Sequence, residues 1–505
     1  MHVPAKGTRS PAGKFKVRSR PCETQRQFRD LKAAIDLMAA FFRWDSVAFR
    51  SAKERCALLS RSERRHWSAT SILGFGFVFH QPSLLQQALP IGYDWENSSA
   101  DKAIPMTEEQ FSPFFERIER PNPNKAVEFQ RHGRLKHLIF GSQLNVQLLE
   151  KLCRSADAIR TMARTPDGNR SLRHLLAHKR AMLYFTQPST RTFLSFMAAC
   201  QILGITCNEV RDPKTSSEVK RESQTDSIRM FSSYFDVIIM RSQVAKLAEV
   251  CAYMMNDLEE TEQRSVPIIN AGAGSDEHPT QALLDMYTIY RTFRFSQGNA
   301  QESSRLSQLK REYPDLVSGP QHKTYLFCGD IARGRTVRSL ATVLSQYPGV
   351  RMFFVVPDHD SLKLDKKLEA NLIASGVEVH QFGSLDEVID GQPILSQTDC
   401  VYMTRIQREH NSPETETELA ALDLEPFRLT RSRVNQLKSF SAILHPFPRD
   451  RVVGEIPTEI DQDPRALYFR QARNGMWARA ALLVHLFDAS EDLMHAQSQT
   501  LQMRS

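Results

Sequence analysis

The feature that most constrains the fold of this chain is a series of short, mostly apolar segments separated by helical stretches. The segments are Ala181–Phe185, Val237–Met240, Val266–Ile269, Thr324–Cys328, Met352–Val356, Val377–His380, Cys400–Met403 and Ser441–Leu444. Segments of this length suit buried strands, and helices between successive strands are typical of parallel sheets. The alternation therefore predicts an α/β architecture with mostly parallel sheets.

Composition excludes several classes of protein. Of the 505 residues, 41% are hydrophobic and 25% are charged, as in ordinary soluble domains. No apolar run approaches the roughly 20 residues needed to span a bilayer, and no apolar signal segment follows Met1. The eight cysteines include no C-x-x-C pair. Buried reduced thiols are therefore expected, rather than a zinc cluster or a disulfide framework.

Positive charge is concentrated at the N-terminus. Residues 1–65 contain 16 basic and 6 acidic residues, whereas the rest of the chain contains 50 basic and 52 acidic residues. A nearly neutral main body argues against a nucleic-acid groove there. Residues 1–22 are predicted to form a disordered basic arm, with an organelle transit peptide as the alternative. Residues 23–130 are predicted to form a mostly helical extension, in which we find no chemical motif.

Groups that suit anions follow the first predicted strands. In parallel α/β sheets, ligands bind beyond the carboxyl ends of the strands. Ser189 is a predicted helix N-cap, and Thr190, Arg191 and Thr192 follow it. A helix N-terminus with hydroxyls and a guanidinium suits a phosphate, although a plain cap with a surface arginine has the same pattern. Arg241 directly follows a second strand and suits an anion as well.

The later strands also end in polar groups. His278 and Gln281 follow a glycine turn, and an imidazole in such a place can polarise a carbonyl group. Arg335 and Arg405 follow two further strands and together suit a dicarboxylate. Prolines flank Phe447 after the last strand, where they constrain the backbone and where an X-Pro bond can be cis.

The segment Gly329–Thr336 nearly matches a nucleotide-binding P-loop, G-x-x-x-x-G-K-[ST], with Arg335 in place of the lysine. An arginine makes a planar two-point contact that suits a carboxylate, whereas the P-loop lysine acts as a compact charge on phosphates. No clear aspartate at a strand end is available to hold magnesium. A nucleotide hydrolase is therefore disfavoured.

Taken together, the motifs resemble those of the aspartate carbamoyltransferase family. They are, in order, F-x-x-P-S-T-R-T, M-R, H-P-T-Q-A-L-L-D, G-R-T-V-x-S-L, Y-M-T-R-x-Q and H-P-x-P-R, and they span residues 135–488. The resemblance implies two doubly wound domains with parallel sheets. It also implies condensation of carbamoyl phosphate with L-aspartate to N-carbamoyl-L-aspartate and phosphate, in pyrimidine synthesis. No cofactor and no catalytic metal are expected.

The resemblance also implies an organisation for the chain. A carbamoyl-phosphate domain is expected over 131–283, completed by a C-terminal helix over 468–488. An aspartate domain is expected over 284–467 and a tail over 489–505. The family forms trimers with shared active sites, so a homotrimer or a multiple of trimers is expected. A separate regulatory subunit and a cytoplasmic location fit this picture, and neither nucleic acid nor membrane is an expected partner.

Site residues are implied by position in the motifs. For carbamoyl phosphate they are Ser189, Thr190, Arg191 and Thr192 at the phosphate, Arg241 and His278 at the carbonyl oxygen, Gln281 at the amine, and the backbone of Pro446 and Phe447. For aspartate they are Arg335 at the α-carboxylate, Arg405 and Gln407 at the β-carboxylate, and Lys220. Ser216 and Lys220 match a loop that reaches into the neighbouring subunit's site. The catalytic residues would be Arg191, Arg241, His278 and Lys220.

The last motif and the loop positions 187 and 410 differ from the patterns of related families. An ornithine carbamoyltransferase usually has H-C-L-P at the last motif, where this chain has Pro446 instead of the cysteine, and Arg405 would repel a cationic substrate. A non-catalytic scaffold homologue is the other alternative. Gln187 stands where the family usually has Glu, and His410 where it usually has Arg. These changes imply a weaker ionic latch between the two domains.

Overall fold

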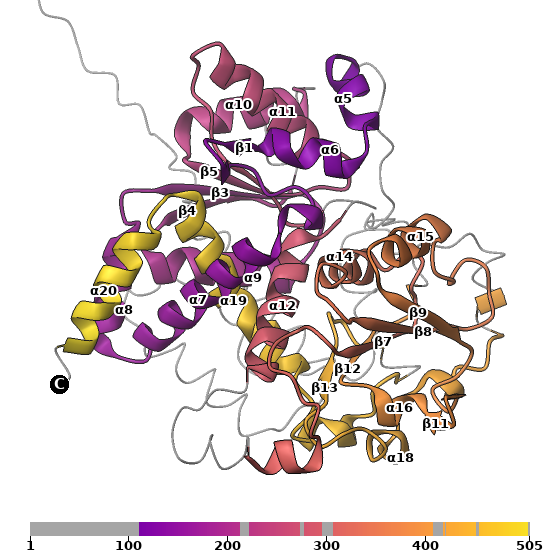
Figure 1. Ribbon diagram of the computed structural model, residues 1–505. Coiled ribbons are helices and arrows are strands. Elements are labelled where there is room, and N and C mark those ends of the chain that lie inside the picture. The colour runs from indigo at the N-terminus through magenta and orange to yellow at the C-terminus, as the bar shows by residue number, and fades with distance from the viewer. Residues whose placement is uncertain are drawn as a thin grey trace, which may run out of the picture. The chain divides into compact units, whose positions relative to one another are not determined.

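The computed structural model describes residues 111–212, 222–272, 277–294, 307–407, 418–419, 421–450 and 454–502. The predicted basic arm, most of the predicted extension, and Ser216, Lys220 and His410 lie outside these residues. Two parallel sheets with flanking helices dominate the described part (Figure 1), beside two short antiparallel strand pairs. The predicted α/β class is therefore confirmed. None of the described helices is both long and apolar enough to cross a lipid bilayer.

The first sheet has four parallel strands in the order β4-β3-β5-β6. Their bounds are β3 Arg180–Phe185, β4 Thr206–Val210, β5 Val237–Arg241 and β6 Ile268–Asn270. Met182 pairs with Ile238, which in turn pairs with Ile268. Met182, Ile238 and Ile268 belong to one apolar cluster. Leu183 and Val237, whose side chains point to the opposite face, belong to another. Both faces of the sheet are therefore buried.

The edge strand β4 was not predicted from the sequence. Its side chains are exposed or half-buried, and its sequence, Thr-Cys-Asn-Glu-Val, contains no apolar run. The strand pairs with β3 in parallel, with Met182 opposite Asn208. An edge strand has a neighbour on one side only, so little in its own sequence marks it as buried.

Helices cover both faces of this sheet. They are α7 Val146–Met162, α8 Pro166–Leu175, α9 Thr190–Leu203, α10 Gln224–Tyr234, α11 Leu247–Glu260 and α12 Pro279–Phe293. Ile228 of α10 and Val250 of α11 are buried in the cluster on one face. Leu149 of α7, Phe196 of α9 and Leu283 of α12 are buried in the cluster on the other. The first domain is therefore doubly wound.

The second sheet has five parallel strands in the order β13-β12-β7-β8-β9. Their bounds are β7 Thr324–Cys328, β8 Arg351–Val355, β9 Glu378–Phe382, β12 Cys400–Met403 and β13 Ala442–Leu444. The helices of this domain include α14 Arg335–Leu344, α15 Lys366–Ala374, α16 Ile394–Gln397 and α18 Arg431–Val434. All five strands coincide with predicted apolar segments, within two residues at each end.

The segment immediately before the first sheet packs into the first domain. It contains α5 Phe115–Glu119, α6 Asn122–Ala126 and a 3-10 turn, η4 Val127–Phe129. Phe129 is fully buried, with its ring centroid 4.8 Å from that of Tyr253. Nζ of Lys125 lies 2.6 Å from Oε1 of Glu249, and both side chains are buried. This part of the predicted extension is thus an integral layer of the domain.

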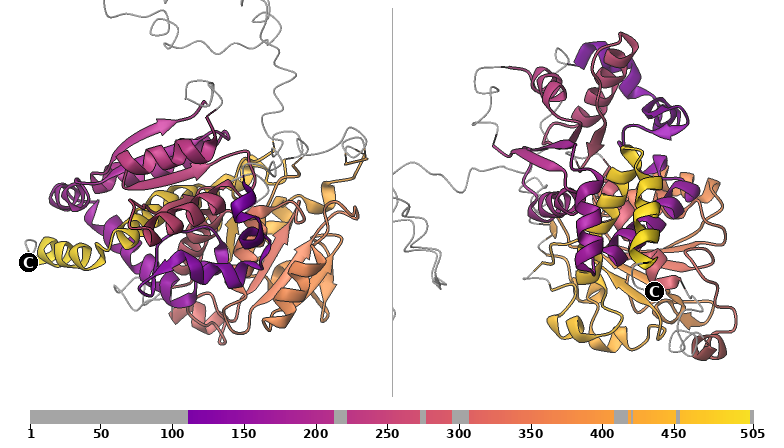
Figure 2. Two further views of the ribbon diagram at one scale, coloured as in Figure 1. Left: turned by 90° about the horizontal axis from the view of Figure 1, so that it is seen from above. Right: turned by 90° about the vertical axis from the view of Figure 1, so that its left-hand side faces the viewer.

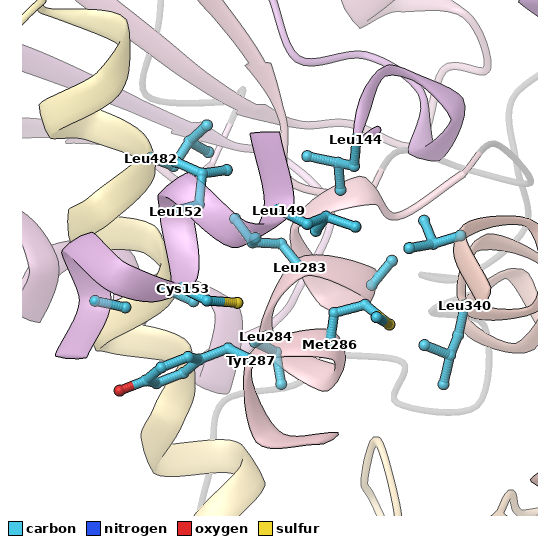
Figure 3. Packing of buried hydrophobic residues seen from close by; sticks show 14 of the residues in the cluster. Leu144, Leu149, Leu152, Cys153, Leu283, Leu284, Met286, Tyr287, Leu340 and Leu482 are labelled. Atoms are coloured by element: carbon cyan, nitrogen blue, oxygen red, sulfur yellow. The ribbon is translucent and has the colours of Figure 1, made fainter. Parts of the chain in front are cut away.

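The C-terminal helices return to the first domain. α19 Tyr468–Leu486 packs against α7, α9 and α12, and α20 Ser490–Gln502 packs against α7 and α8 (Figure 2). The predicted tail over 489–505 is therefore largely helical, with Leu493 buried. Leu482 of α19 joins Leu152 of α7, Leu283 of α12 and Leu340 of α14 in one apolar cluster (Figure 3). That cluster contains helices from both domains.

Candidate active site

A cavity of about 710 Å³ lies where the carboxyl ends of the strands of both sheets meet. The structure brings to it every predicted site residue that it describes. These are Ser189, Thr190, Arg191, Thr192, Arg241, His278, Gln281, Arg335, Arg405, Gln407, Pro446 and Phe447. Ser216 and Lys220 lie outside the described residues, so their place in the site stays a prediction.

Three helices begin at the cavity, and no side chain caps any of them. Their N-cap residues are Ser189 for α9, His278 for α12 and Gly334 for α14. Elsewhere side chains do cap helices: Asn145 accepts the N–H of Leu148 at the start of α7. Ser189 is thus at the predicted position, but its hydroxyl makes no capping hydrogen bond. Uncapped N-termini carry partial positive charge and amide donors, which suit an anionic ligand.

A glycine lets two predicted catalytic side chains lie close against the backbone after β6. Gly272 follows β6 with φ of +94°, and a Cβ atom there would lie 2.7 Å from Nη1 of Arg241 and 2.8 Å from Cδ2 of His278. Nη1 of Arg241 also donates to the carbonyl oxygen of Ala271 at 3.3 Å. Both functional side chains therefore occupy space that any other residue at position 272 would fill.

His278 is held as a neutral imidazole. Its side chain is buried, and this burial, with the charges of Arg241, Arg335 and Arg479, keeps its pKa well below the usual value. Nδ1 lies 3.4 Å from Oγ1 of Thr280. A neutral imidazole has one N–H donor, which can stabilise negative charge on a carbonyl oxygen without giving up a proton.

Arginines from both domains line the cavity. The guanidinium of Arg191 lies 5.6 Å from the ring centroid of Phe447. Burial lowers the pKa of Arg191, and the charge of Arg405 lowers it further. Because the two positive charges repel each other, an anion bound between them is favoured.

The turn after β13 is fixed by a histidine. The N–H of Phe447, which has φ of +57°, donates to Nδ1 of His445 at 2.8 Å. Nε2 of His445 then carries the proton and donates to Oε1 of Glu455 at 2.8 Å. The Phe447–Pro448 bond is cis, as the proline pattern suggested. The two hydrogen bonds of His445 link this turn, which lines the cavity, to Glu455.

Sequence reasoning missed several residues that organise the site. Asp330, fully buried, accepts the N–H of Gln407 at 3.1 Å and that of Arg333 at 3.2 Å. Arg479 of α19 is buried, lines the cavity, and donates to Ser195 and Thr280. Burial lowers its pKa to about 9. A helical arginine far along the chain carries no sequence signal for such a role, whereas Asp330 lies inside the Gly329–Thr336 segment.

The cavity is strongly cationic. Seven arginines line it, namely Arg191, Arg241, Arg333, Arg335, Arg338, Arg405 and Arg479, and no carboxylate does so among the described residues. The described part of the chain also has no cluster of His, Cys, Asp or Glu suited to a metal ion. The arrangement favours one or two small anions with several negative charges.

Gln187 is buried at the edge of the cavity, 3% exposed, and its N–H donates to the carbonyl oxygen of Arg241 at 3.2 Å. Its Oε1 accepts no hydrogen bond within the described part of the chain. The residue is therefore neutral where the resemblance implies an acidic latch. His410, the other predicted departure, lies outside the described residues.

Comparison with known proteins gives independent evidence of the family to which the chain belongs. Residues 136–291 match the carbamoyl-P binding domain of aspartate/ornithine carbamoyltransferase, and residues 321–486 match the Asp/Orn binding domain. The chain belongs to the aspartate/ornithine carbamoyltransferase family. The resemblance predicted from the motifs is thus confirmed, and so are the fold class and the assignment to transferase enzymes.

Relatives and solved structures that match this chain include aspartate carbamoyltransferases. The chloroplastic enzyme of Arabidopsis thaliana is 35% identical over 69% of this chain and 77% of its own length. The catalytic subunit of Vibrio cholerae is 33% identical over 70% of this chain and 97% of its own. The structure of the Trypanosoma cruzi enzyme in complex with carbamoyl phosphate and aspartate has a TM-score of 0.56, with 29% identity over 69% and 96% of the two chains.

Proposed function

We propose that this family member transfers the carbamoyl group of carbamoyl phosphate to L-aspartate, giving N-carbamoyl-L-aspartate and phosphate. The observation that carries the proposal is the convergence of Arg191, Arg335 and Arg405 on one cavity that also contains a neutral His278. Guanidinium groups bind phosphate and carboxylate in planar two-point contacts. A phosphate and a dicarboxylate together match this distribution of charge, and the names of the relatives agree with it.

Carbamoyl phosphate would bind at the start of α9. Ser189, Thr190, Arg191 and Thr192 would hold its phosphate, with the uncapped helix N-terminus adding partial positive charge. Arg241 and His278 would donate to the carbonyl oxygen, and Gln281 would contact the amine. The backbone carbonyls of Pro446 and Phe447 would face the reacting amines.

L-Aspartate would bind against the second domain. Arg335, the first residue of α14, would take the α-carboxylate, and Arg405 with Gln407 would take the β-carboxylate. The buried Asp330 holds the backbone N–H of Gln407. The Gln407 side chain would thus reach the β-carboxylate from a backbone position that Asp330 holds.

The reaction would proceed by direct attack. The aspartate amine forms a C–N bond to the carbamoyl carbon, negative charge gathers on the carbonyl oxygen, and the C–O bond to phosphate then breaks. The amine must lose a proton. No carboxylate lines the cavity among the described residues, so the departing phosphate would take this proton. Catalysis would come from positioning and from preorganised positive charge.

We also propose that the active unit is a homotrimer or a multiple of trimers. In it Ser216 and Lys220 of a neighbouring copy would enter each site, and Lys220 would touch aspartate. A separate regulatory subunit is compatible with this assembly. We propose a cytoplasmic location. The alternative is import into an organelle through residues 1–22, and the Arabidopsis relative, which is named chloroplastic, favours that alternative.

A ureido-product assay on purified protein tests the proposal. Carbamoyl phosphate is supplied with L-aspartate, and in a parallel reaction with L-ornithine. Product with aspartate and none with ornithine is expected. Product only with ornithine would assign the chain to the other branch of its family, and no product with either would support the scaffold alternative.

A further inference from the structure

A buried carboxylate sits one helical turn behind Gln281 on α12. Asp285 is fully buried and accepts hydrogen bonds from three side chains. Nε2 of Gln281 donates to its Oδ1 at 2.9 Å, and Nε2 of Gln471 donates to the same atom at 2.6 Å. The hydroxyl of Tyr402, on β12, donates to Oδ2 at 2.8 Å. One side chain thus joins α12, α19 and the second sheet.

The direction of this network is set by a backbone group. The N–H of His445 can only donate, and it donates to Oε1 of Gln471 at 2.8 Å. The amide nitrogen of Gln471 must therefore face Asp285, which makes Oδ1 an acceptor. The nitrogen of Gln281, which also donates to Oδ1, is directed away from the cavity. The remaining terminal atom of Gln281, its Oε1, is left for the cavity that this residue lines.

The acceptor character of Oδ1 does not depend on whether Asp285 is ionised. Burial raises the pKa of Asp285 to about 7, against the lowering effect of its three hydrogen bonds. Both partners of Oδ1 are amide nitrogens, which only donate. A proton on Asp285 would therefore sit on Oδ2, where the Tyr402 hydroxyl can turn and accept it. Gln281 keeps the same orientation in either state.

We infer that Asp285 is a positioning residue that fixes the amide of Gln281 with its oxygen toward the substrate. The site would then select a carbamoyl group, whose NH₂ can donate a hydrogen bond to that oxygen. This inference rests on the proposed function. The carbamoyl NH₂ satisfies an amide oxygen, whereas the methyl group of acetyl phosphate, of similar shape, leaves it without a partner. Leaving such a group unpaired lowers binding on the order of 10–100-fold.

The test compares carbamoyl phosphate with acetyl phosphate as donors to L-aspartate. The ratio of their kcat/KM values is measured by mass spectrometry of N-carbamoyl- and N-acetyl-L-aspartate. Asp285→Leu removes the acceptor, so the Gln281 amide can rotate, and the ratio should fall on the order of 10–100-fold below that of the parent protein. An unchanged ratio in an active Asp285→Leu protein overturns the inference.

Two further variants separate positioning from general damage. Asp285→Asn retains an acceptor at the Oδ1 position, with its amide nitrogen facing the Tyr402 hydroxyl, so the ratio should return to within a few-fold of the parent value. Tyr402→Phe removes only the bond to Oδ2 and should also keep the ratio. A fall in the ratio in Asp285→Asn as large as that in Asp285→Leu contradicts the mechanism.

Gln281→Leu covers the case in which Asp285→Leu does not fold, because Gln281 lies at the cavity wall. This variant should lose the same selectivity, and retained selectivity overturns the inference. The proposed function is judged separately, by whether the parent protein makes N-carbamoyl-L-aspartate at all. A parent protein that makes this product but does not prefer carbamoyl phosphate refutes the role of Asp285 alone.

Discussion

Gly272 and Arg241 are so close that a Cβ atom on Gly272 would lie 2.7 Å from Nη1 of the arginine. Gly272→Ala should therefore displace Arg241 and His278 while also straining a backbone with φ of +94°. Misplacement of reacting groups by about 1 Å can cost on the order of 10²-fold, so kcat/KM should fall by about that factor. Steady-state kinetics with circular dichroism as a folding control measures it. Normal kinetics in a folded variant would show that catalysis does not need Arg241 and His278 to lie so close to residue 272.

His278→Ala should reduce turnover on the order of 10²–10³-fold, because it removes one donor to the carbonyl oxygen in the transition state. Since burial and three arginines hold the pKa of His278 well below its usual value, the parent protein should show no loss of kcat near pH 6.5 from protonation of this residue. Turnover of both proteins is measured between pH 6 and pH 9. Unchanged turnover in the variant would remove His278 from the mechanism.

Arg405→Gln should raise the KM for aspartate on the order of 10–100-fold, because a charge-assisted hydrogen bond contributes about 1.5–3 kcal/mol. Binding of carbamoyl phosphate should change little, since Arg405 is assigned to the other substrate. Initial rates at varied aspartate, with carbamoyl phosphate saturating and then varied, separate the two effects. An equal loss of affinity for both substrates would argue against this division of the cavity.

Lys125→Met should destabilise the fold, by less than the roughly 3–5 kcal/mol of a fully unpaired buried charge. It leaves the buried carboxylate of Glu249 without the lysine 2.6 Å away, while Lys246, at 3.4 Å, remains paired with it. The double variant Lys125→Met with Glu249→Leu removes both charges and should recover most of that loss. Urea unfolding of the parent and both variants gives the free energies. A single variant as stable as the parent would mean that α6 is not an integral part of the domain.

Stability should fall in acid partly through His485. Burial, with Lys151 and Arg134 nearby, lowers the pKa of His485 to about 4. Between that value and the unfolded value of about 6.5, the unfolded chain binds more protons, so the free energy of unfolding falls as pH drops through this interval. The loss is at most about 3 kcal/mol. His485→Gln should flatten this part of the curve in urea unfolding at pH 7, 6, 5 and 4, and an unaltered slope would exclude His485 as the cause.

Much of the site could be predicted because its residues lie in short loops directly after recognisable strands. Cys400–Met403 is apolar and β12 has those bounds, so Arg405 follows a strand end both in the sequence and in space. In a parallel sheet the carboxyl ends of the strands lie at the same edge. Motifs that follow successive strands in the sequence therefore line one cavity. The same reasoning located Ser189 and Arg335 at helix starts, where the structure also has them.

What the sequence by itself determined was the α/β class, the predicted strands and the set of anion-binding groups, since each depends on apolar patterning within a few residues. Only the tertiary structure revealed β4, whose edge position requires no apolar run, and the packing of Phe129 against Tyr253. Only the tertiary structure also decided that Gln471 meets Asp285 across 186 positions of the chain, which no local pattern encodes. The physical reason is that burial and hydrogen-bond direction are properties of the assembled interior, not of any one segment.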